Sequence, residues 1–376
     1  MAQTLTSGRS RSAVRVREAR FEDYEKVTAL QLRNGLAARS YTGWTALWSK
    51  NPAYSRRSAF PIGWVLEGPR GEIGGYLGNL PAEYRLRGRA VRAVAPYSWA
   101  VDPSYRRHSL ALFFRFVKQR GADMFVCTTP NPISERIIRA FKFCRTPSGT
   151  WDRTAFWITG YRGFARGVLR AAPVPLPQLL AHPISAALFL IDVLRDATGT
   201  NHADHGIELC SSFDARFDVF WSALESENQN RLLAVRTRET LEWHFGPGLA
   251  QGKVWIVAAS AGGRLVAYSI FDRRDHPGLR LKRIRFVDFQ ALSGFEELLR
   301  PVLAWMLRQC RREQIDVAEN VGCWLRRFRV PGTAADHHRR LRCWQFYYRT
   351  RDKELHEHLQ DPNVWMPSSF DGDTSL

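Results

Sequence analysis

The sequence has no apolar stretch long enough to cross a lipid bilayer. Its most apolar segment, residues 184–194, is too short for a membrane span and contains Asp192, so it predicts a packed helix. Residues 1–14 lack the apolar centre of a secretory signal peptide. From these absences we expect a cytoplasmic protein without a transmembrane segment.

The chain also lacks any C-x-x-C pair among its six cysteines. A disulfide framework is not indicated for a chain of 376 residues, and most of the cysteines lie in apolar or amphipathic runs, so reduced thiols are expected. Cys127 ends an apolar run with no histidine or acid beside it, which favours packing over a nucleophilic role. The cysteines are Cys127, Cys144, Cys210, Cys310, Cys323 and Cys343.

Histidines are not grouped with the acids or cysteines that a metal site needs. The pairs at 337–338 and 356–358 predict surface histidines, and His202 and His205 fit a polar loop as well as they fit a casual metal site. We therefore expect no metal.

No run of five basic residues occurs, although the net charge is +19 and the pI about 10.2. The missing run argues against a dedicated nucleic-acid tail. The excess of arginine and lysine indicates a surface that attracts phosphates, nucleic acid, anionic lipid or acidic glycans. A bias toward arginine for solubility or genomic reasons accounts for it equally well.

The first half alternates between helical and extended patterns. Residues 13–19 alternate as a strand does, a helical period follows up to Gly35, and a helix ending at Pro52 comes next. Residues 62–79 predict a hairpin, and the rest adds two strands and two helices. The order β-α-α-β-β-β-α-β-α predicts a mixed α/β sheet.

The second half repeats this order at a spacing near 200 residues, including a short helix with a glycine-proline stop at 246–248 and a hairpin at 253–272. Such repetition predicts two related α/β domains, each a mixed, mostly antiparallel sheet flanked by helices. The expected ranges are a first domain at 1–162, a proline-rich linker with an apolar helix at 163–210, a second domain at 211–350 and a tail at 351–376.

A basic turn stands where the strand "SWAV" runs into a helix. Arg106 and Arg107 lie at the start of that helix, where negative charge would normally be favoured. Free backbone N–H groups and the helix dipole at such a turn can hold a pyrophosphate, and arginines add charge and forked donors. The turn therefore predicts an anionic ligand. A solvated basic turn is the alternative.

The residues around this turn resemble the GNAT acetyltransferase superfamily. Its signature is Gln or Arg, two residues, Gly, one residue, then Gly or Ala, and residues 106–111 fit it with Ser109 in the glycine position. The run "NPISERIIRAFKF" resembles the last motif of the family. The resemblance covers residues 13–158 well and the second half mainly in element order. A weaker likeness, through residues 241–245 and the end of the tail, is to acyltransferases of surface-polysaccharide pathways.

The resemblance implies binding of acetyl-CoA or another acyl-CoA. The end of the fourth strand would pair with the pantetheine arm, the basic turn would hold the pyrophosphate through its backbone, and the cap of the last helix would lie near the pantetheine. These residues are Trp99, Ala100 and Val101, then Arg106, Arg107, His108, Ser109, Leu110 and Ala111, and then Asn131.

Two departures from the family bear on catalysis. Ile138 occupies the position where many members carry a tyrosine that protonates the thiolate, and the strand "RAVAPYSWAV" has no acid to serve as base. Tyr97 is the candidate proton donor in that strand. Packing of its ring beside Trp99 is the alternative reading.

The second half lacks the basic turn. Glu296 and Glu297 lie at the equivalent helix start and would repel a pyrophosphate, so this copy is expected not to bind coenzyme. Asp288 in the preceding strand could orient a substrate amine or hydroxyl. Alternatively, it faces solvent or another domain as a partner of Arg283 or Arg285.

The expected function is acyl transfer from acetyl-CoA, or another acyl-CoA, to an amine acceptor, for which an amino sugar is one candidate. Two alternatives remain open. Both copies could be catalytically silent and bind nucleic acid or acidic glycan, or the chain could take aminoacyl-tRNA as donor. The acceptor, the acyl length and the oligomeric state do not follow from the sequence.

Overall fold

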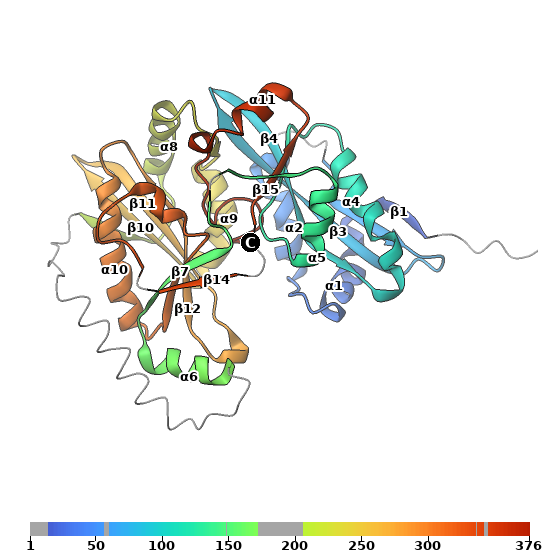
Figure 1. Cartoon of the computed structure of the whole chain (residues 1–376), viewed down its shortest axis with the longest axis horizontal. Helices are drawn as coiled ribbons and strands as arrows, with labels where there is room; N and C mark the ends of the chain where they lie inside the picture. Colours follow the sequence, from blue (N-terminus) through green and yellow to red (C-terminus); the bar gives the residue numbers. More distant parts are fainter. Residues whose placement is uncertain (1–13, 56–59, 148, 172–205, 336, 342–344) are drawn as a thin grey trace, which may run out of the picture. The chain divides into compact units, whose positions relative to one another are not determined.

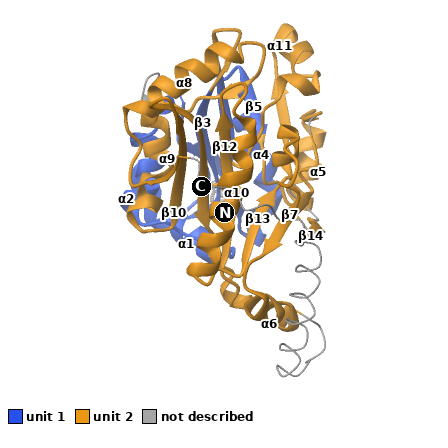
Figure 2. Cartoon of the chain, turned by 90° about the vertical axis from the view of Figure 1, so that its left-hand side faces the viewer, with its two compact units in different colours: residues 1–83, 92–126 blue, residues 84–91, 127–376 orange. Residues whose placement is uncertain are grey.

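The computed structural model describes residues 14–55, 60–147, 149–171, 206–335, 337–341 and 345–376 (Figure 1). Within them no helix has the length and apolarity of a membrane span. The chain divides into two compact units (Figure 2). Unit 1 comprises residues 1–83 and 92–126, and unit 2 comprises residues 84–91 and 127–376. The expected apolar helix at 184–194 lies outside the described residues.

The sheet of unit 1 has the strand order β1-β2-β3-β4-β5. The first three strands are antiparallel neighbours, which confirms the hairpin expected at 62–79, and β4 pairs with β5 in parallel. The bounds are β1 Arg15–Glu18, β2 Gly63–Glu67, β3 Ile73–Leu86, β4 Arg89–Val101 and β5 Met124–Cys127. The last residues of β3 and the first residues of β4 belong to unit 2.

Tryptophans of α2 form the centre of the unit 1 core. Ser40 caps this helix by accepting from the N–H of Gly43, and Trp44 and Trp48 are fully buried beneath it. The indole N–H of Trp48 donates to the carbonyl of Asn79 in β3 at 2.6 Å, which fixes the helix on the sheet. The helices are α1 Tyr24–Arg33, α2 Tyr41–Ser49, α3 Pro52–Ser55 and α4 Ser109–Lys118, with 3₁₀ turns η1 Phe21–Asp23 and η2 Pro103–His108.

Unit 2 contains a second sheet, of order β14-β7-β13-β12-β11-β10-β8. β12 and β13 are parallel, and the other neighbouring strands of this sheet are antiparallel. Two short pairings lie outside this sheet: β15 with β6, and β9 with the end of β3. The bounds are β6 Cys144–Arg145, β7 Arg153–Ile158, β8 Ile207–Cys210, β9 Leu233–Ala234, β10 Val254–Ala261, β11 Arg264–Arg273, β12 Arg283–Ala291, β13 Val317–Val321, β14 His337–Arg340 and β15 Tyr347–Thr350.

Helices of unit 2 pack on this sheet, α8 against β11, α9 against β10 and α10 against β13 (Figure 1). The bounds are α5 Pro132–Ala140, α6 Tyr161–Ala171, α8 Ala215–Glu227, α9 Arg238–Ala250, α10 Leu299–Arg312 and α11 Lys353–His358, with 3₁₀ turns η4 Pro277–Leu279, η5 Glu296–Leu298, η6 Trp324–Phe328 and η7 Pro362–Val364.

Several elements differ from the sequence expectation. The glycine-proline stop at 246–248 is wrong, because α9 continues to Ala250 with Pro247 inside it. The helix ends within one turn of this proline, so few backbone hydrogen bonds are at stake. Residues 163–171 of the expected linker form most of α6, and β8 at its other end joins the second sheet. β7, inside the range expected for the first domain, also pairs in the second sheet.

The end of the chain is part of the unit 2 core. Trp365 and Phe370 are buried, and the indole N–H of Trp365 donates to the carbonyl of Leu359 at 2.8 Å. Residues 351–376 were expected to be a tail. In the structure they carry buried aromatic and polar groups that complete unit 2.

The close approach of β2 and β3 at Gly63 leads to a stability prediction. Gly63 has a φ of 153°, and a Cβ there would lie 2.4 Å from the carbonyl oxygen of Leu77. Gly63→Ala is expected to lower the free energy of unfolding by about 3 kcal/mol, because backbone on both strands must move. Denaturant unfolding measures the loss.

Gly71→Ala is the matched control. Gly71 also has a positive φ, 76°, but nothing lies within 4 Å of an added Cβ. Its substitution should cost only about 1 kcal/mol for the left-handed backbone. Equal losses for the two variants would contradict the close approach of β2 and β3.

Candidate functional site

The parallel strands β4 and β5 separate soon after they meet. Their register consists of Ala93 opposite Met124 and Val94 opposite Phe125. β5 ends at Cys127, whereas β4 continues to Val101. The end of β4 therefore runs past its parallel partner, which is the geometry that lets an extended ligand lie along a strand edge.

A left-handed residue lies in β4 four residues beyond Val94, the last residue that pairs with β5. Ser98 has a φ of 52°, and its hydroxyl accepts from the side-chain amide of Gln31 at 2.7 Å. A non-glycine residue in this conformation carries strain of about 1–3 kcal/mol, which functional sites often retain. The distortion turns the backbone just before Trp99–Val101, the segment expected to face the pantetheine.

Trp99 adds an unpaired donor at this point. Its ring stacks on Phe113 of α4 with a centroid distance of 5.2 Å and an interplanar angle of 9°. Its indole N–H is buried and has no hydrogen-bond partner among the described residues. A buried donor without an acceptor costs about 1–3 kcal/mol, so an acceptor from a ligand would stabilise it.

The basic turn lies in η2 and the first turn of α4. Arg106 and Arg107 are exposed, and the Arg107 side chain donates to the ring of His108 at 3.0 Å. The N–H of Ser109 already donates to the carbonyl of Arg106. The backbone donors expected at residues 106–111 are thus partly engaged in helical turns, and the exposed guanidinium groups are the accessible donors.

Asp102 fixes the start of this turn. It receives hydrogen bonds from the Arg33 guanidinium, the shortest 2.6 Å, and from the Asn34 amide at 2.9 Å. These contacts, led by Arg33, hold the pKa of Asp102 below its usual range. The carboxylate that directly precedes the basic turn is therefore neutralised by α1.

The Tyr97 side chain contacts the segment between α1 and α2. Its hydroxyl oxygen accepts from the Arg39 guanidinium at 2.9 Å, and the side chain is half-buried. The phenol O–H is still available to donate. The structure thus places the candidate proton donor beside a cation, and its catalytic role stays a prediction.

Asn131 caps α5. Its side-chain oxygen accepts from the N–H groups of Ile133 and Ser134 at 3.0 and 2.9 Å, and Ser134 closes the capping box. The capping role expected from the sequence is confirmed. Contact of Asn131 with a pantetheine stays a prediction.

A carboxylate that the sequence did not indicate, that of Asp373, lies beside the two residues that follow β5. Thr128 and Thr129 come directly after β5, and their hydroxyls donate to Asp373 at 2.8 and 2.9 Å. Burial raises the pKa of Asp373. A search for an acid within the fourth strand could not find it, because this acid lies 245 residues away from Thr128 in the chain.

Asp288 lies in a buried network of unit 2. Its carboxylate pairs with the Arg236 guanidinium through two contacts, of 2.6 and 3.2 Å, and also accepts from Gln290 at 2.8 Å. Neither alternative partner expected from the sequence is correct, because Arg283 and Arg285 pair with Glu319. A solvent-facing Asp288 is also wrong, since the residue is fully buried.

The last residues of the chain complete this network. Arg236 also donates to the Ser368 hydroxyl at 3.3 Å and stacks on the Phe370 ring, while Asp371 accepts from Tyr84 at 2.9 Å. Burial raises the pKa of Asp371. Burial alone would lower the pKa of Arg236, but Asp288 outweighs it and the pKa is raised.

The second copy's helix start carries acids, as expected. Glu296 accepts from the N–H of Gly294 at 3.0 Å, and Glu297 pairs with Arg300 at 2.9 Å. These carboxylates occupy the η5–α10 start that would otherwise attract an anion. Absence of coenzyme binding in this copy stays a prediction.

Five of the six cysteines lie among the described residues. The described cysteines are free, and burial raises the pKa of the Cys127 thiol well above its ordinary value, which argues against a nucleophilic thiolate. Within the described residues no three histidine, cysteine or acidic side chains group as metal ligands would.

The fold is shared with solved N-acyltransferase structures. N-myristoyltransferase of Saccharomyces cerevisiae, solved with bound myristoyl-CoA and inhibitors, matches with a TM-score of 0.55 and 11% identity over 90% of this chain and 81% of that one. A GCN5-related N-acetyltransferase from Anabaena variabilis matches with a TM-score of 0.52 and 12% identity over 90% and 73%.

A protein of unknown function from Enterococcus faecalis, described as a probable N-acyltransferase, matches with a TM-score of 0.54 and 13% identity over 90% of this chain and 72% of that one. No protein-family model matches the sequence, and no curated protein matches it. The GNAT-like fold is therefore established, and the tandem arrangement fits the N-myristoyltransferase architecture.

The buried pair of Arg236 and Asp288 leads to a prediction about stability. Asp288→Leu should lower the free energy of unfolding by about 3–5 kcal/mol, because it leaves the Arg236 charge buried and unpaired. Adding Arg236→Met should recover part of this loss. Chemical denaturation of both single variants and the double variant gives the coupling energy. Strictly additive losses would contradict the pairing.

Proposed function

We propose that the chain is an acyl-CoA-dependent N-acyltransferase. The observation that carries the proposal is that β4 continues from Val94, its last pair with β5, through the left-handed Ser98 to the segment before the basic turn, without pairing with β5. The fold shared with N-acyltransferase structures supports the same conclusion. Acetyl-CoA is the donor expected from the resemblance, although the structures solved with myristoyl-CoA have the same fold.

The coenzyme would be held by one strand edge and one turn. The backbone of Trp99–Val101 would pair with the amides of the pantetheine arm, and a pantetheine carbonyl would supply the acceptor that the Trp99 indole lacks. The exposed guanidinium groups of Arg106 and Arg107 would hold the pyrophosphate with forked, charge-assisted hydrogen bonds.

The chemistry needs the acceptor amine and the thioester to be in contact. The neutral amine nitrogen attacks the thioester carbonyl carbon, the C–S bond breaks, and the proton that the nitrogen loses passes to water. The departing thiolate takes a proton from the Tyr97 hydroxyl, and the phenolate is reprotonated from water.

The acceptor is proposed as an amine because every named structural neighbour is an N-acyltransferase or described as a probable one. An amino sugar rests only on the weaker resemblance to surface-polysaccharide acyltransferases. A peptide amine is the other class that the neighbours suggest. Cytoplasmic location stays an expectation.

Binding of the coenzyme is tested first. Arg106→Glu should weaken the affinity for acetyl-CoA at least about tenfold, because it replaces a charge-assisted contact by repulsion. Arg120→Glu, beyond the other end of α4, makes the same change of charge on an exposed residue and should leave the affinity within about twofold. Isothermal titration measures both. Absence of heat with wild-type protein, or equal affinities for the two variants, contradicts the coenzyme site.

Catalysis is tested through Tyr97. Tyr97→Phe removes the proposed proton donor, so kcat should fall about tenfold while the affinity for acetyl-CoA is retained. A wild-type kcat for this variant would exclude the phenol as the group that protonates the thiolate.

A further inference from the structure

Unit 2 contains a cavity that the proposed acyl transfer does not use. Its volume is about 700 Å³, and it lies between the start of α6, the connection from η4 to β12 and the end of α10. This volume falls in the range of small-molecule sites. Its lining residues are Thr159, Gly160, Tyr161, Arg162, Gly163, Arg166, Arg280, Lys282, Arg311, Gln314 and Asp316.

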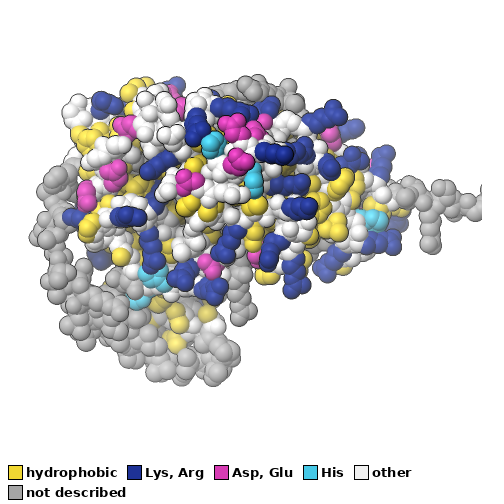
Figure 3. All heavy atoms as spheres, turned by 45° about the horizontal axis from the view of Figure 1, so that its top comes forward, with side chains coloured by type: hydrophobic (Ala, Val, Ile, Leu, Met, Phe, Trp, Pro, Cys, Tyr) yellow, Lys and Arg dark blue, Asp and Glu magenta, His cyan; other side chains and the backbone are white. Residues whose placement is uncertain are grey.

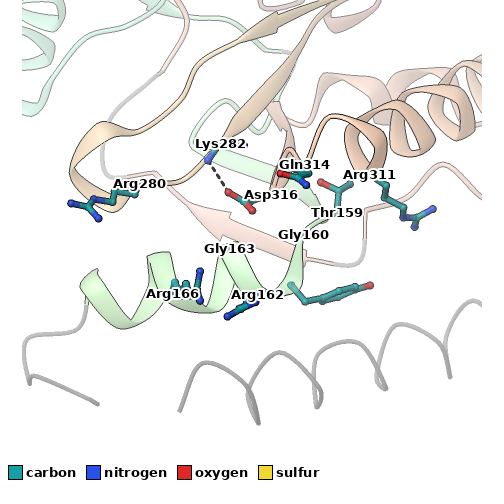
Figure 4. A pocket seen from close by; sticks show the side chains of 11 residues that line it. Thr159, Gly160, Arg162, Gly163, Arg166, Arg280, Lys282, Arg311, Gln314 and Asp316 are labelled. Atoms are coloured by element: carbon teal, nitrogen blue, oxygen red, sulfur yellow. Dashed lines mark hydrogen bonds between the residues drawn. The ribbon is translucent and has the colours of Figure 1, made fainter. Parts of the chain in front are cut away.

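Positive charge dominates this cavity. Five lining side chains are cationic, and one is acidic. Figure 4 shows Asp316 in the middle, with Arg162 and Arg166 on α6 on one side of it, Lys282 opposite, and Arg280 and Arg311 farther out to either side. Among the described residues, none of the four arginines that line the cavity makes a side-chain ion pair. Other arginines of unit 2 do form such pairs, namely Arg216, Arg236, Arg273, Arg283 and Arg339.

The single acid is committed to the fold. Asp316 accepts from the backbone N–H of Lys282 at 2.9 Å, which joins the starts of β12 and β13. Burial raises the pKa of Asp316, and the nearby Asp275 is paired with Arg273. The acid therefore offsets only a small part of the positive charge around it.

The backbone brings α6 close to this acid. A Cβ on Gly163 would lie 1.7 Å from a carboxylate oxygen of Asp316, and one on Gly160 would lie 2.8 Å from the same atom. Only glycine permits this approach, which places the first turn of α6 in the cavity wall. The first turn of a helix favours anions through its unpaired N–H groups and its dipole.

The face of the molecule seen in Figure 3 does not have this arrangement. Figure 3 shows arginine and lysine side chains scattered over the visible face and mixed with acids and apolar groups. Positive charges scattered over a surface attract extended polyanions weakly and do not fix a bound anion in one position. In contrast, the lining of the α6 cavity brings five cationic residues from α6, the η4–β12 connection and the end of α10 around one hollow.

We propose that this cavity binds a compact, multiply charged phosphate group of a small soluble molecule, such as a nucleotide or sugar phosphate. Arginine favours phosphate because its planar fork donates two parallel hydrogen bonds. A hollow of this volume fits a compact anion, whereas a nucleic-acid duplex or a lipid surface needs an extended basic face. The site is separate from the acyl-CoA site in its residues.

The probe is inorganic tripolyphosphate, titrated into the full chain in buffer free of divalent metal. Arg311→Glu and Arg162→Glu should each weaken its affinity at least about tenfold, because each removes a charge-assisted contact and adds repulsion. The matched control is Arg312→Glu, since Arg312 is the exposed neighbour of Arg311 and does not line the cavity. It makes the same change of net charge and should alter the affinity by no more than about twofold.

A second background separates the two sites. The titrations are repeated in Arg106→Glu, which removes the turn proposed for coenzyme, and the loss caused by Arg311→Glu should persist there. Arg311→Glu should bind acetyl-CoA as wild-type does, which also shows that it is folded. If the coenzyme site proves to be wrongly assigned, the effect of Arg311→Glu on tripolyphosphate binding can still be interpreted.

Three outcomes would overturn the proposal. The first is no heat with tripolyphosphate, and the second is equal weakening by Arg311→Glu and Arg312→Glu. The third is binding to single-stranded oligonucleotide or to vesicles of phosphatidylcholine with phosphatidylserine while tripolyphosphate fails to bind, since either would indicate a macromolecular polyanion or a lipid surface.

Discussion

The buried ion pair between Arg236 and Asp288 is the constraint on which unit 2 depends. Neither charge is tolerable alone in a dry interior, where the penalty for desolvating an ion is several kcal/mol. Each is therefore obliged to bind the other, and the remaining donors of Arg236 reach the carbonyl of Ala234 and the hydroxyl of Ser368. One side chain thus joins β9, β12 and the last segment of the chain.

This obligation explains why the end of the chain is folded inward. Ser368 is held by the pair, Asp371 of the same turn accepts from Tyr84, and two residues later Asp373 receives both threonine hydroxyls after β5. The position of Asp373 is therefore an outcome of a structural network within unit 2. A change that loosens the pair should displace this carboxylate without touching it.

How far the sequence leads depends on the range of the interaction. The hairpin at 62–79, the cap at Asn131 and the basic turn are local, since their evidence lies within a few residues, and these could be predicted. The strand β7 could not be placed in the correct sheet, because its apolar alternation fits either sheet and its partner β13 lies far along the chain. Asp373 and the partner of Asp288 failed to emerge for the same reason.

The same distinction applies to charge. A net charge of +19 is visible in the composition, but it does not say where an anion would bind. Many arginines are neutralised by acids, as Arg17 is by Asp23 and Arg92 by Asp123, and these contribute little to recognition. What makes a site is cations that remain without acids and share one concave volume. Only folding brings α6, the start of β12 and the end of α10 together, so selectivity at the α6 cavity arises from geometry, and the excess of arginine merely supplies the side chains.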